Sequence, residues 1–271
     1  TVIVGPTAVG KTDYSIELAK EYRSPVISCD SRQIFREMKI GTAPPSPEQL
    51  AAVKHYFIFS HSVSQYYTAG KYELEALEVI NELFKTHDRL VVVGGSGLYV
   101  DALCYGLDDF PPADIELRNQ LMERLDKEGI ESLRMELKQL DPESYHSMDI
   151  ANRQRVVRAL EVTLMTGRKF SSFKTNKAKE RPFKINKIVM SMPREELYGR
   201  INRRVDMMFD AGLVQEVESL LQYREMPALQ TVGYKEIFEY FDGKHSLETA
   251  RELIKRNTRR YAKKQISYFK R

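Results

Sequence analysis

Thr1-Val-Ile-Val-Gly-Pro-Thr-Ala-Val-Gly-Lys-Thr12 opens the chain, and this stretch decides the fold. Its apolar, mostly β-branched residues Val2 to Val4 predict a buried strand. The next eight residues fill every fixed position of the phosphate-loop pattern G-x-x-x-x-G-K-[ST]. Backbone N–H groups of such a loop converge on anionic oxygens, and the following helix directs its positive end at the same point. The stretch therefore predicts a strand, a phosphate-binding loop and a helix.

The predicted phosphate-binding residues are those of this loop: Gly5, Pro6, Thr7, Ala8, Val9, Gly10, Lys11 and Thr12. Lys11 supplies a mobile positive charge, and the Thr12 hydroxyl is the predicted ligand of a magnesium ion. The loop alone does not identify the molecule that carries the phosphates. Nucleoside triphosphates, nucleoside monophosphates and other diphosphate esters all fit it.

The length of 271 residues, 42 % of them hydrophobic, indicates a globular chain with one large domain or a domain plus an insertion. No apolar run approaches the roughly 18 residues of a membrane span, so no membrane association is expected. Cys29 and Cys104 are the only cysteines and lack C-x-x-C spacing, which favours a reducing, cytoplasmic setting. The five histidines show no metal-ligand spacing and receive no role. Nothing in the sequence demands a dimer, so a monomer is expected.

The charge distribution is uneven. Residues 151–205 hold 15 lysines and arginines against 4 acidic residues, and residues 251–271 hold 9 against 1. The whole chain nevertheless carries only +4, so the remainder is acidic. Two basic blocks on an acidic body indicate a polyanionic partner, with nucleic acid the first candidate. Solvated basic helices without a ligand are the alternative.

Apolar strands and amphipathic helices alternate over the first part of the chain, which predicts a parallel sheet with right-handed crossovers. The expected strands after the first are residues 26–29, 55–59, 90–93 and, later in the chain, 185–190. Asp30 follows the second of these, at the sheet edge where such folds bind ligands. It is a candidate general base or metal ligand, or else the N-cap of the turn that follows. A second glycine-rich turn, Gly94 to Tyr99, is expected at the same edge, with the Ser96 hydroxyl available to substrate.

Motor or switch chemistry is disfavoured, because the strand over residues 90–93 ends in Gly94 where ATP-hydrolysing motors carry a Mg²⁺-binding aspartate. Residues 114–170 show only helical periodicity, over residues 114–127, 129–140, 142–147 and 152–166. The predicted fold is α/β: a P-loop-type parallel sheet core, residues 1–107 and 183–271, flanked by helices, with an inserted all-helical domain at 108–182. Residues 169–184 form a basic segment interleaved with phenylalanines, a pattern that suits single-stranded nucleic acid.

The last two long helices are predicted at residues 194–209 and 247–269. The first carries Arg200, Arg203 and Arg204, some of which we expect at the phosphate crevice. In the second, a seven-residue recurrence predicts an inward stripe of Leu247, Ile254, Tyr261 and Tyr268.

Five stretches in this order resemble the tRNA dimethylallyltransferases, also known as tRNA isopentenyltransferases. They are Gly5 to Thr12, Asp30-Ser-Arg-Gln-Ile-Phe-Arg-Glu-Met-Lys-Ile-Gly-Thr-Ala43, Gly94-Gly-Ser-Gly-Leu-Tyr99, Asn152-Arg-Gln-Arg-Val-Val-Arg-Ala-Leu-Glu161 and Val232-Gly-Tyr-Lys-Glu236. The resemblance spans nearly the whole chain. Two positions depart from the family pattern, since Ser96 replaces a commoner Thr and Phe35 a commoner Tyr.

The resemblance implies transfer of a dimethylallyl group from dimethylallyl diphosphate, with Mg²⁺, to the exocyclic N6 amine of the adenosine immediately 3′ of the tRNA anticodon. It makes Asp30 the base that accepts the amine proton, and it assigns Thr7 to Thr12 to the diphosphate, with Lys11 and Thr12 counted as catalytic. It also assigns contacts with the tRNA anticodon stem-loop to Asp30, Ser31, Arg32, Gln33, Ser96, Arg118, Gln154, Arg155, Val156, Val157, Arg158, Gln230, Thr231, Val232, Gly233, Tyr234 and Lys235.

Three other functions remain open on the sequence. A P-loop small-molecule kinase shares the phosphate loop, magnesium and ATP binding. An adenylate isopentenyltransferase keeps the chemistry but uses free AMP, ADP or ATP as acceptor. A non-catalytic RNA-binding module with a relic nucleotide site is the third.

Overall fold

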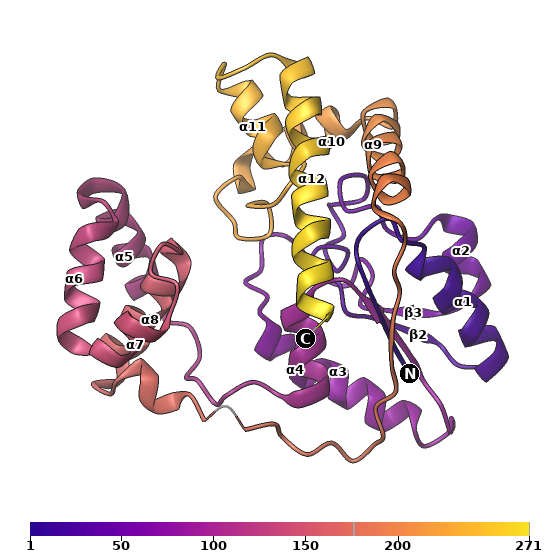
Figure 1. Ribbon diagram of the computed structural model, residues 1–271, viewed down its shortest axis with the longest axis horizontal. Coiled ribbons are helices and arrows are strands. Elements are labelled where there is room, and N and C mark those ends of the chain that lie inside the picture. Colours follow the sequence, from indigo (N-terminus) through magenta and orange to yellow (C-terminus); the bar gives the residue numbers. More distant parts are fainter. Residues whose placement is uncertain (176, 271) are drawn as a thin grey trace. The chain divides into compact units, whose positions relative to one another are not determined.

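The computed structural model of the protein describes residues 1–175 and 177–270, coloured along the chain in Figure 1. Asn176 in the basic segment and Arg271 at the end of the second basic block lie outside the described residues. The chain forms two compact units, residues 1–106 with 180–271 and residues 107–179. The sequence placed these boundaries at 107/108 and 182/183.

The first unit is built on a parallel five-stranded sheet in the order β3-β2-β4-β1-β5. Its strands are β1 (Val2–Val4), β2 (Val26–Ser28), β3 (His55–Tyr56), β4 (Val91–Gly94) and β5 (Lys187–Val189). Val4 lies opposite Gly94 on one side and Val189 on the other, so these three strands end at one edge. The predicted α/β class and parallel sheet are confirmed.

Helices cover the apolar strands. α1 (Lys11–Tyr22) packs Ala19 against Ile3, Val26 and Val91. α3 (Ala69–Leu83) and α4 (Gly97–Tyr105) pack against each other, and the buried Tyr72 hydroxyl of α3 donates to the Ser28 carbonyl at the end of β2. A short α2 (Pro47–Ala52) begins at Ser46 with a capping box. The buried layer thereby fixes the strand ends from which the functional loops emerge.

Two expectations differ from the structure here. The third strand was predicted over residues 55–59 but ends at Tyr56, because Phe57 and Phe59 adopt left-handed backbone conformations with φ of 62° and 53° that leave the sheet. The glycine-rich turn after β4 continues directly into α4, a helix that the sequence did not indicate.

The C-terminal part of the first unit contributes the remaining helices and one 3₁₀ turn: α9 (Arg194–Asp210), α10 (Leu213–Ser219), η2 (Leu221–Tyr223), α11 (Lys235–Phe241) and α12 (Leu247–Phe269). The long α12, yellow in Figure 1, packs against α9 and α11. Its buried side consists of Ala250, Ile254, Ala262, Gln265 and Phe269. The expected stripe is therefore wrong at Tyr261, which is 41 % exposed. At this level of the helix the buried positions are Ala262 and Gln265, and Tyr261 lines an open cavity of the first unit instead.

The second unit is all-helical, as predicted. It contains α5 (Ile115–Glu128), α6 (Ile130–Leu140), α7 (Pro142–Ser147), α8 (Arg153–Thr166) and the 3₁₀ turn η1 (Phe170–Phe173). Leucines 121, 125, 133, 137 and 160 form its core together with two valines and an alanine of α8. Over residues 1–175 and 177–270, no helix combines the length and the hydropathy that crossing a bilayer requires.

Candidate active site

The phosphate loop has the backbone that its glycines predict. Gly10, at φ 100°, is the N-cap of α1, and Ala8 is also left-handed at φ 66°. At Gly5 a Cβ atom would lie 2.6 Å from the Met190 carbonyl oxygen beyond β5, so only glycine fits there. The loop is consequently held between β1, β5 and the N-terminus of α1.

A cavity of about 830 Å³ in the first unit opens over this loop. Lys11 and Thr12 line it together with Asp30, Ser31, Arg32 and Gln33, so the structure brings the two predicted chemical segments into one cavity. Further lining comes from the loop over residues 39–47, from α9 and α12, and from Thr231, Val232 and Gly233, among others.

Lys11 folds back over its own loop. Its Nζ donates to the carbonyl oxygens of Gly5 at 3.0 Å and Pro6 at 2.7 Å. Burial lowers the pKa of Lys11 to about 8, with the nearby Asp30 carboxylate acting in the opposite direction and Arg204 lowering it further. A bound diphosphate would add negative charge beside this buried ammonium group.

Two arginines of α9 reach the phosphate loop, as the sequence led us to expect for some of the three. Arg204 Nη1 lies 3.3 Å from the Thr7 hydroxyl, and Arg200 Nη2 lies close to Gly10. Both line the cavity, whereas Arg203 is exposed and does not. Burial and the Arg200 charge lower the pKa of Arg204. Lys11, Arg200 and Arg204 therefore form a cationic cluster with the geometry of an anion site.

Asp30 sits at the C-terminal end of β2. Its Oδ1 accepts from the backbone N–H groups of Arg32 at 2.8 Å and Gln33 at 3.2 Å, which is the capping geometry considered as the alternative to a chemical role. Both bonds fall on the same oxygen. They fix the carboxylate on the cavity wall and leave Oδ2 without a hydrogen bond in the described chain, so the capping and chemical roles are compatible.

Ser96 lies behind the cavity wall. It is buried, accepts from the Ser31 N–H at 3.0 Å and donates to the Ser31 hydroxyl at 3.1 Å. A Cβ atom at the preceding Gly94 would lie 2.5 Å from the Cys29 carbonyl oxygen. The second glycine turn therefore packs directly on the segment that carries Asp30, and Ser96 supports that segment.

Gln265 of α12 joins the two glycine loops, a role that the sequence did not reveal. Its Oε1 accepts from the Thr7 N–H and its Nε2 donates to the Gly95 carbonyl, both at 2.8 Å. The side chain is buried. The only signal in the sequence is an amide on the buried side of a basic helix.

Tyr261, one turn earlier on α12, also lines the cavity. Burial of the hydroxyl and the charge of Asp30 raise the pKa of Tyr261 to about 12, while the neighbouring Ser96 and Gln265 side chains act in the opposite direction. The phenol is therefore a hydrogen-bond donor at neutral pH beside the Asp30 segment. Sequence reasoning missed it by placing it in the core.

Several predicted contact residues do not line the cavity. Gly5, Pro6 and Val9 are buried within the phosphate loop, and Val9 packs with Ala8 against α9. Gln230 uses its amide on the Arg224 carbonyl, and Lys235 is exposed outside the cavity. Tyr234 is wholly buried, so its side chain is not accessible to a bound tRNA.

The predicted contacts in the second unit form two groups. Gln154 and Arg155 are exposed, but Val156 and Val157 belong to the core of the unit, so direct side-chain contact at these two positions is ruled out. Arg118 and Arg158 both form ion pairs with Glu161.

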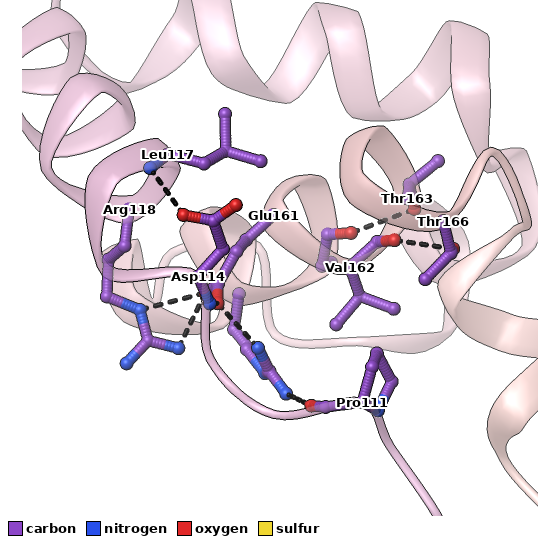
Figure 2. Close-up of polar contacts among 10 residues, drawn as sticks. Pro111, Asp114, Leu117, Arg118, Glu161, Val162, Thr163 and Thr166 are labelled. Carbon is purple, nitrogen blue, oxygen red and sulfur yellow. Dashed lines mark hydrogen bonds and ion pairs between the residues drawn. The ribbon is translucent and has the colours of Figure 1, made fainter.

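Figure 2 shows the Glu161 carboxylate, which is fully buried, at the centre of this group. Arg118 donates to its Oε2 through Nε at 2.8 Å and Nη2 at 2.6 Å. Arg158 donates to Oε1 at 2.6 Å, and the Asp114 N–H also donates to Oε1 at 2.9 Å. Arg158 further binds the Pro111 carbonyl. Both arginines therefore hold the start of α5 to α8, and 19 % and 26 % of their side chains remain exposed.

Phe170 and Phe173 of the basic segment are engaged inside the second unit. Phe170 stacks on Phe110 with ring centroids 4.6 Å apart, and Phe173 also meets Phe110. These rings already pack on Phe110, so stacking on bases, which the sequence pattern suggested, would require them to leave this aromatic cluster.

The site offers hard oxygen ligands of the kind that Mg²⁺ prefers. The Thr12 hydroxyl and the Asp30 carboxylate line one cavity. Among the described residues no group of three or more His, Cys, Asp and Glu side chains is placed to hold a metal by itself. The residues therefore fit an ion that is shared with the phosphates of a substrate, as Mg²⁺ commonly is.

The sequence is similar to those of known proteins. The sequence model of the IPP transferase family matches residues 33–271. A tRNA dimethylallyltransferase 1 of Bacteroides thetaiotaomicron is 49 % identical over 270 residues, which is all of this chain and 88 % of that protein. A tRNA dimethylallyltransferase of Christiangramia forsetii is 49 % identical over 268 residues, covering 99 % and 89 % of the two chains.

Solved structures agree in fold. A full-length tRNA isopentenylpyrophosphate transferase from Bacillus halodurans superposes with a TM-score of 0.69 at 36 % identity, over 99 % of this chain and 86 % of that one. A eukaryotic dimethylallyltransferase acting on tRNA gives a TM-score of 0.80 at 26 % identity, over 98 % and 68 %. The family match begins after the phosphate loop, so it does not depend on that widespread motif. The chain belongs to the IPP transferase family.

Proposed function

We propose that this protein transfers a dimethylallyl group from dimethylallyl diphosphate to the exocyclic N6 amine of the adenosine immediately 3′ of the anticodon in tRNA. The observation that carries the proposal is the single cavity lined by the cationic phosphate loop and by Asp30. Relatives at 49 % identity are named tRNA dimethylallyltransferases, which supports the same reaction.

The donor diphosphate binds at the phosphate loop, where Lys11, Arg200 and Arg204 gather. Lys11 exchanges its two backbone carbonyl partners for phosphate oxygens, and the N-terminus of α1 faces the same anion. These cations stabilise the negative charge that develops on the departing diphosphate as the C1–O bond breaks.

The acceptor amine reacts poorly by itself because its lone pair is delocalised into the adenine ring. Asp30 accepts the amine proton as the N6–C1 bond forms, and its fixed carboxylate supplies the required orientation. The base must leave its stack to reach the cavity, as in other enzymes that modify bases. Ser31, Arg32 and Gln33 line the space beside Asp30 and would contact the adenine base that enters it.

Magnesium, bound through Thr12 and the donor phosphates, would add positive charge at the leaving group. The exposed Gln154 and Arg155 of α8 and the basic side of α12 are proposed to contact the phosphates of the stem-loop. We further propose that the protein acts as a monomer in the cytoplasm; its two cysteines are free and buried, as suits a reducing compartment.

The test is transfer of radiolabelled dimethylallyl diphosphate, with Mg²⁺, to three acceptors in parallel. They are an anticodon stem-loop with adenosine at the target position, the same loop with guanosine there, and free AMP. Label on the adenosine loop alone is the expected result. Label on AMP would instead identify an adenylate isopentenyltransferase, and ATP consumption without label would identify a kinase.

A further inference from the structure

One carboxylate outside the predicted site ties a cavity wall to the protein core. Glu216 of α10 accepts from the backbone N–H groups of Lys39 at 2.8 Å and Ile40 at 2.7 Å through Oε2. Its Oε1 accepts from the Gly41 N–H at 3.0 Å and from the Tyr234 hydroxyl at 2.7 Å. All four donors converge on one side chain, and charge-assisted bonds of this kind are the strong ones.

The bound backbone belongs to the cavity. Lys39, Ile40 and Gly41 line it, followed by Thr42 and Ala43. The far end of this wall is held by Gln33, whose Nε2 donates to the carbonyl oxygens of Thr42 at 3.2 Å and Ala43 at 3.0 Å. The wall over residues 39–43 is therefore held at one end by Glu216 and at the other by Gln33, in the segment that carries Asp30.

Tyr234 completes the attachment. Its ring is wholly buried, and a Cβ atom at Gly41 would lie 2.6 Å from it. Burial and the Glu216 carboxylate raise the pKa of Tyr234, so the phenol stays protonated and donates. The segment around Tyr234 thus reaches the cavity through Glu216 and Gly41.

We propose that Glu216 and Tyr234 are positioning residues that hold the wall over residues 39–43 against the acceptor nucleotide. The inference rests on the proposed function. The acceptor is favoured over the donor because the wall is continuous with Asp30 and Gln33, whereas the donor phosphates belong to the loop over residues 5–12. Gln33 holds its amide hydrogens on the wall, which keeps its Oε1 free for an acceptor amine when the wall is in place.

The test compares E216Q with E218Q in the full chain. Glu218 is exposed on the same helix and serves as the matched control. In E216Q an amide NH₂ replaces a carboxylate oxygen and faces backbone donors, so we expect kcat/KM for the stem-loop to fall about tenfold. The affinity for inorganic diphosphate should stay within about twofold, and amide exchange at residues 39–41 should accelerate. E218Q should match the parent in all three measurements.

Y234F removes one of the four hydrogen bonds to Glu216 and keeps the ring against Gly41. We therefore expect kcat/KM for the stem-loop to fall about threefold, with the diphosphate affinity again unchanged. Y234F carries the test if E216Q does not fold. Unchanged stem-loop kinetics in the folded variants, or an equal loss of diphosphate affinity, would overturn the positioning role. If the parent labels no acceptor, the proposed function fails separately; stem-loop affinity and amide exchange in the same variants still decide whether Glu216 positions the wall.

Discussion

At the scale of single residues, Asp30 shows how one side chain serves structure and chemistry together. Its Oδ1 caps the Arg32 and Gln33 N–H groups, and an asparagine oxygen can do the same. We therefore expect Asp30→Asn to fold and to bind tRNA and diphosphate as the parent does. Removing the base should lower turnover by about a hundredfold or more. Label transfer under saturating substrates measures this, and near-normal turnover would remove Asp30 from the base role.

We expect Lys11 to make binding of the proposed donor sensitive to pH. Its pKa is lowered to about 8, so the ammonium group is mostly charged at pH 7 and mostly neutral at pH 9. Donor affinity should fall as pH rises through 8, approaching about tenfold per pH unit if only the charged form binds. Stability moves the other way: between pH 8 and 10.5 the unfolded chain holds more protons at this lysine, so its contribution to the free energy of unfolding rises with pH.

Calorimetric titration of the diphosphate between pH 7 and 10 measures the effect. K11R supplies the control, because an arginine stays charged over this range. Its affinity should change less with pH than that of the parent. Parallel pH profiles for the two proteins would show that another group governs the dependence.

At the scale of elements, the functional loops are held by long-range polar links. Gln265 of α12 connects the loop after β1 with the turn after β4, and both partners are backbone groups. Q265M keeps the volume but leaves a donor and an acceptor unsatisfied, at a cost of about 1 to 3 kcal/mol each. Because the Thr7 N–H lies in the phosphate loop, we expect diphosphate affinity to fall by about tenfold. S267A, at an exposed position of the same helix, should leave it unchanged; an unaltered affinity in Q265M would show that the loop keeps its shape without this link.

Glu161 plays the corresponding part in the second unit. Removing a fully buried carboxylate leaves the guanidinium groups of Arg118 and Arg158 without their counter-charge. E161Q should therefore destabilise α5 and α8 by about 3 kcal/mol. E123Q removes only the exposed pair with Lys127, which solvent screens, and should leave the protection of both helices unchanged. Amide exchange in the two helices measures both, and similar protection in the two variants would contradict the structural role of Glu161.

These elements also show what the sequence could predict. The phosphate loop, Asp30 and the four insertion helices depend on local patterns, such as glycine spacing, strand ends and helical periodicity, and these were predicted correctly in place. The link from Glu216 to Gly41 joins residues 175 positions apart, and a single sequence contains no signal for such a pairing. The burial of Tyr261, Val156 and Val157 was predicted wrongly for a similar reason, because it depends on which elements pack together in the folded chain.

At the scale of the whole molecule, the two basic blocks predict how the enzyme distinguishes its two anionic substrates. A stem-loop that contacts many cations releases many counterions, so its affinity should fall steeply with salt, roughly 0.7 to 0.9 log units per log unit of salt for each phosphate contact. The diphosphate meets only the few cations of the cavity, so its affinity should depend on salt much less. Fluorescence titration of both ligands between about 50 and 200 mM salt gives the two slopes.

Charge variants locate the contacts. Lys263 is exposed on α12 within the basic block, and Lys20 is exposed on α1 within the acidic remainder. K263Q should reduce the salt slope of the stem-loop by about one contact, and K20Q should leave it unchanged. Equal slopes in K263Q and the parent would place the tRNA away from this face of α12, and an equal reduction in both variants would mean that only the total charge matters. K263Q and K20Q should differ because counterions are released only where phosphates contact the protein. The salt slope therefore depends on where a cation lies as well as on how many cations there are.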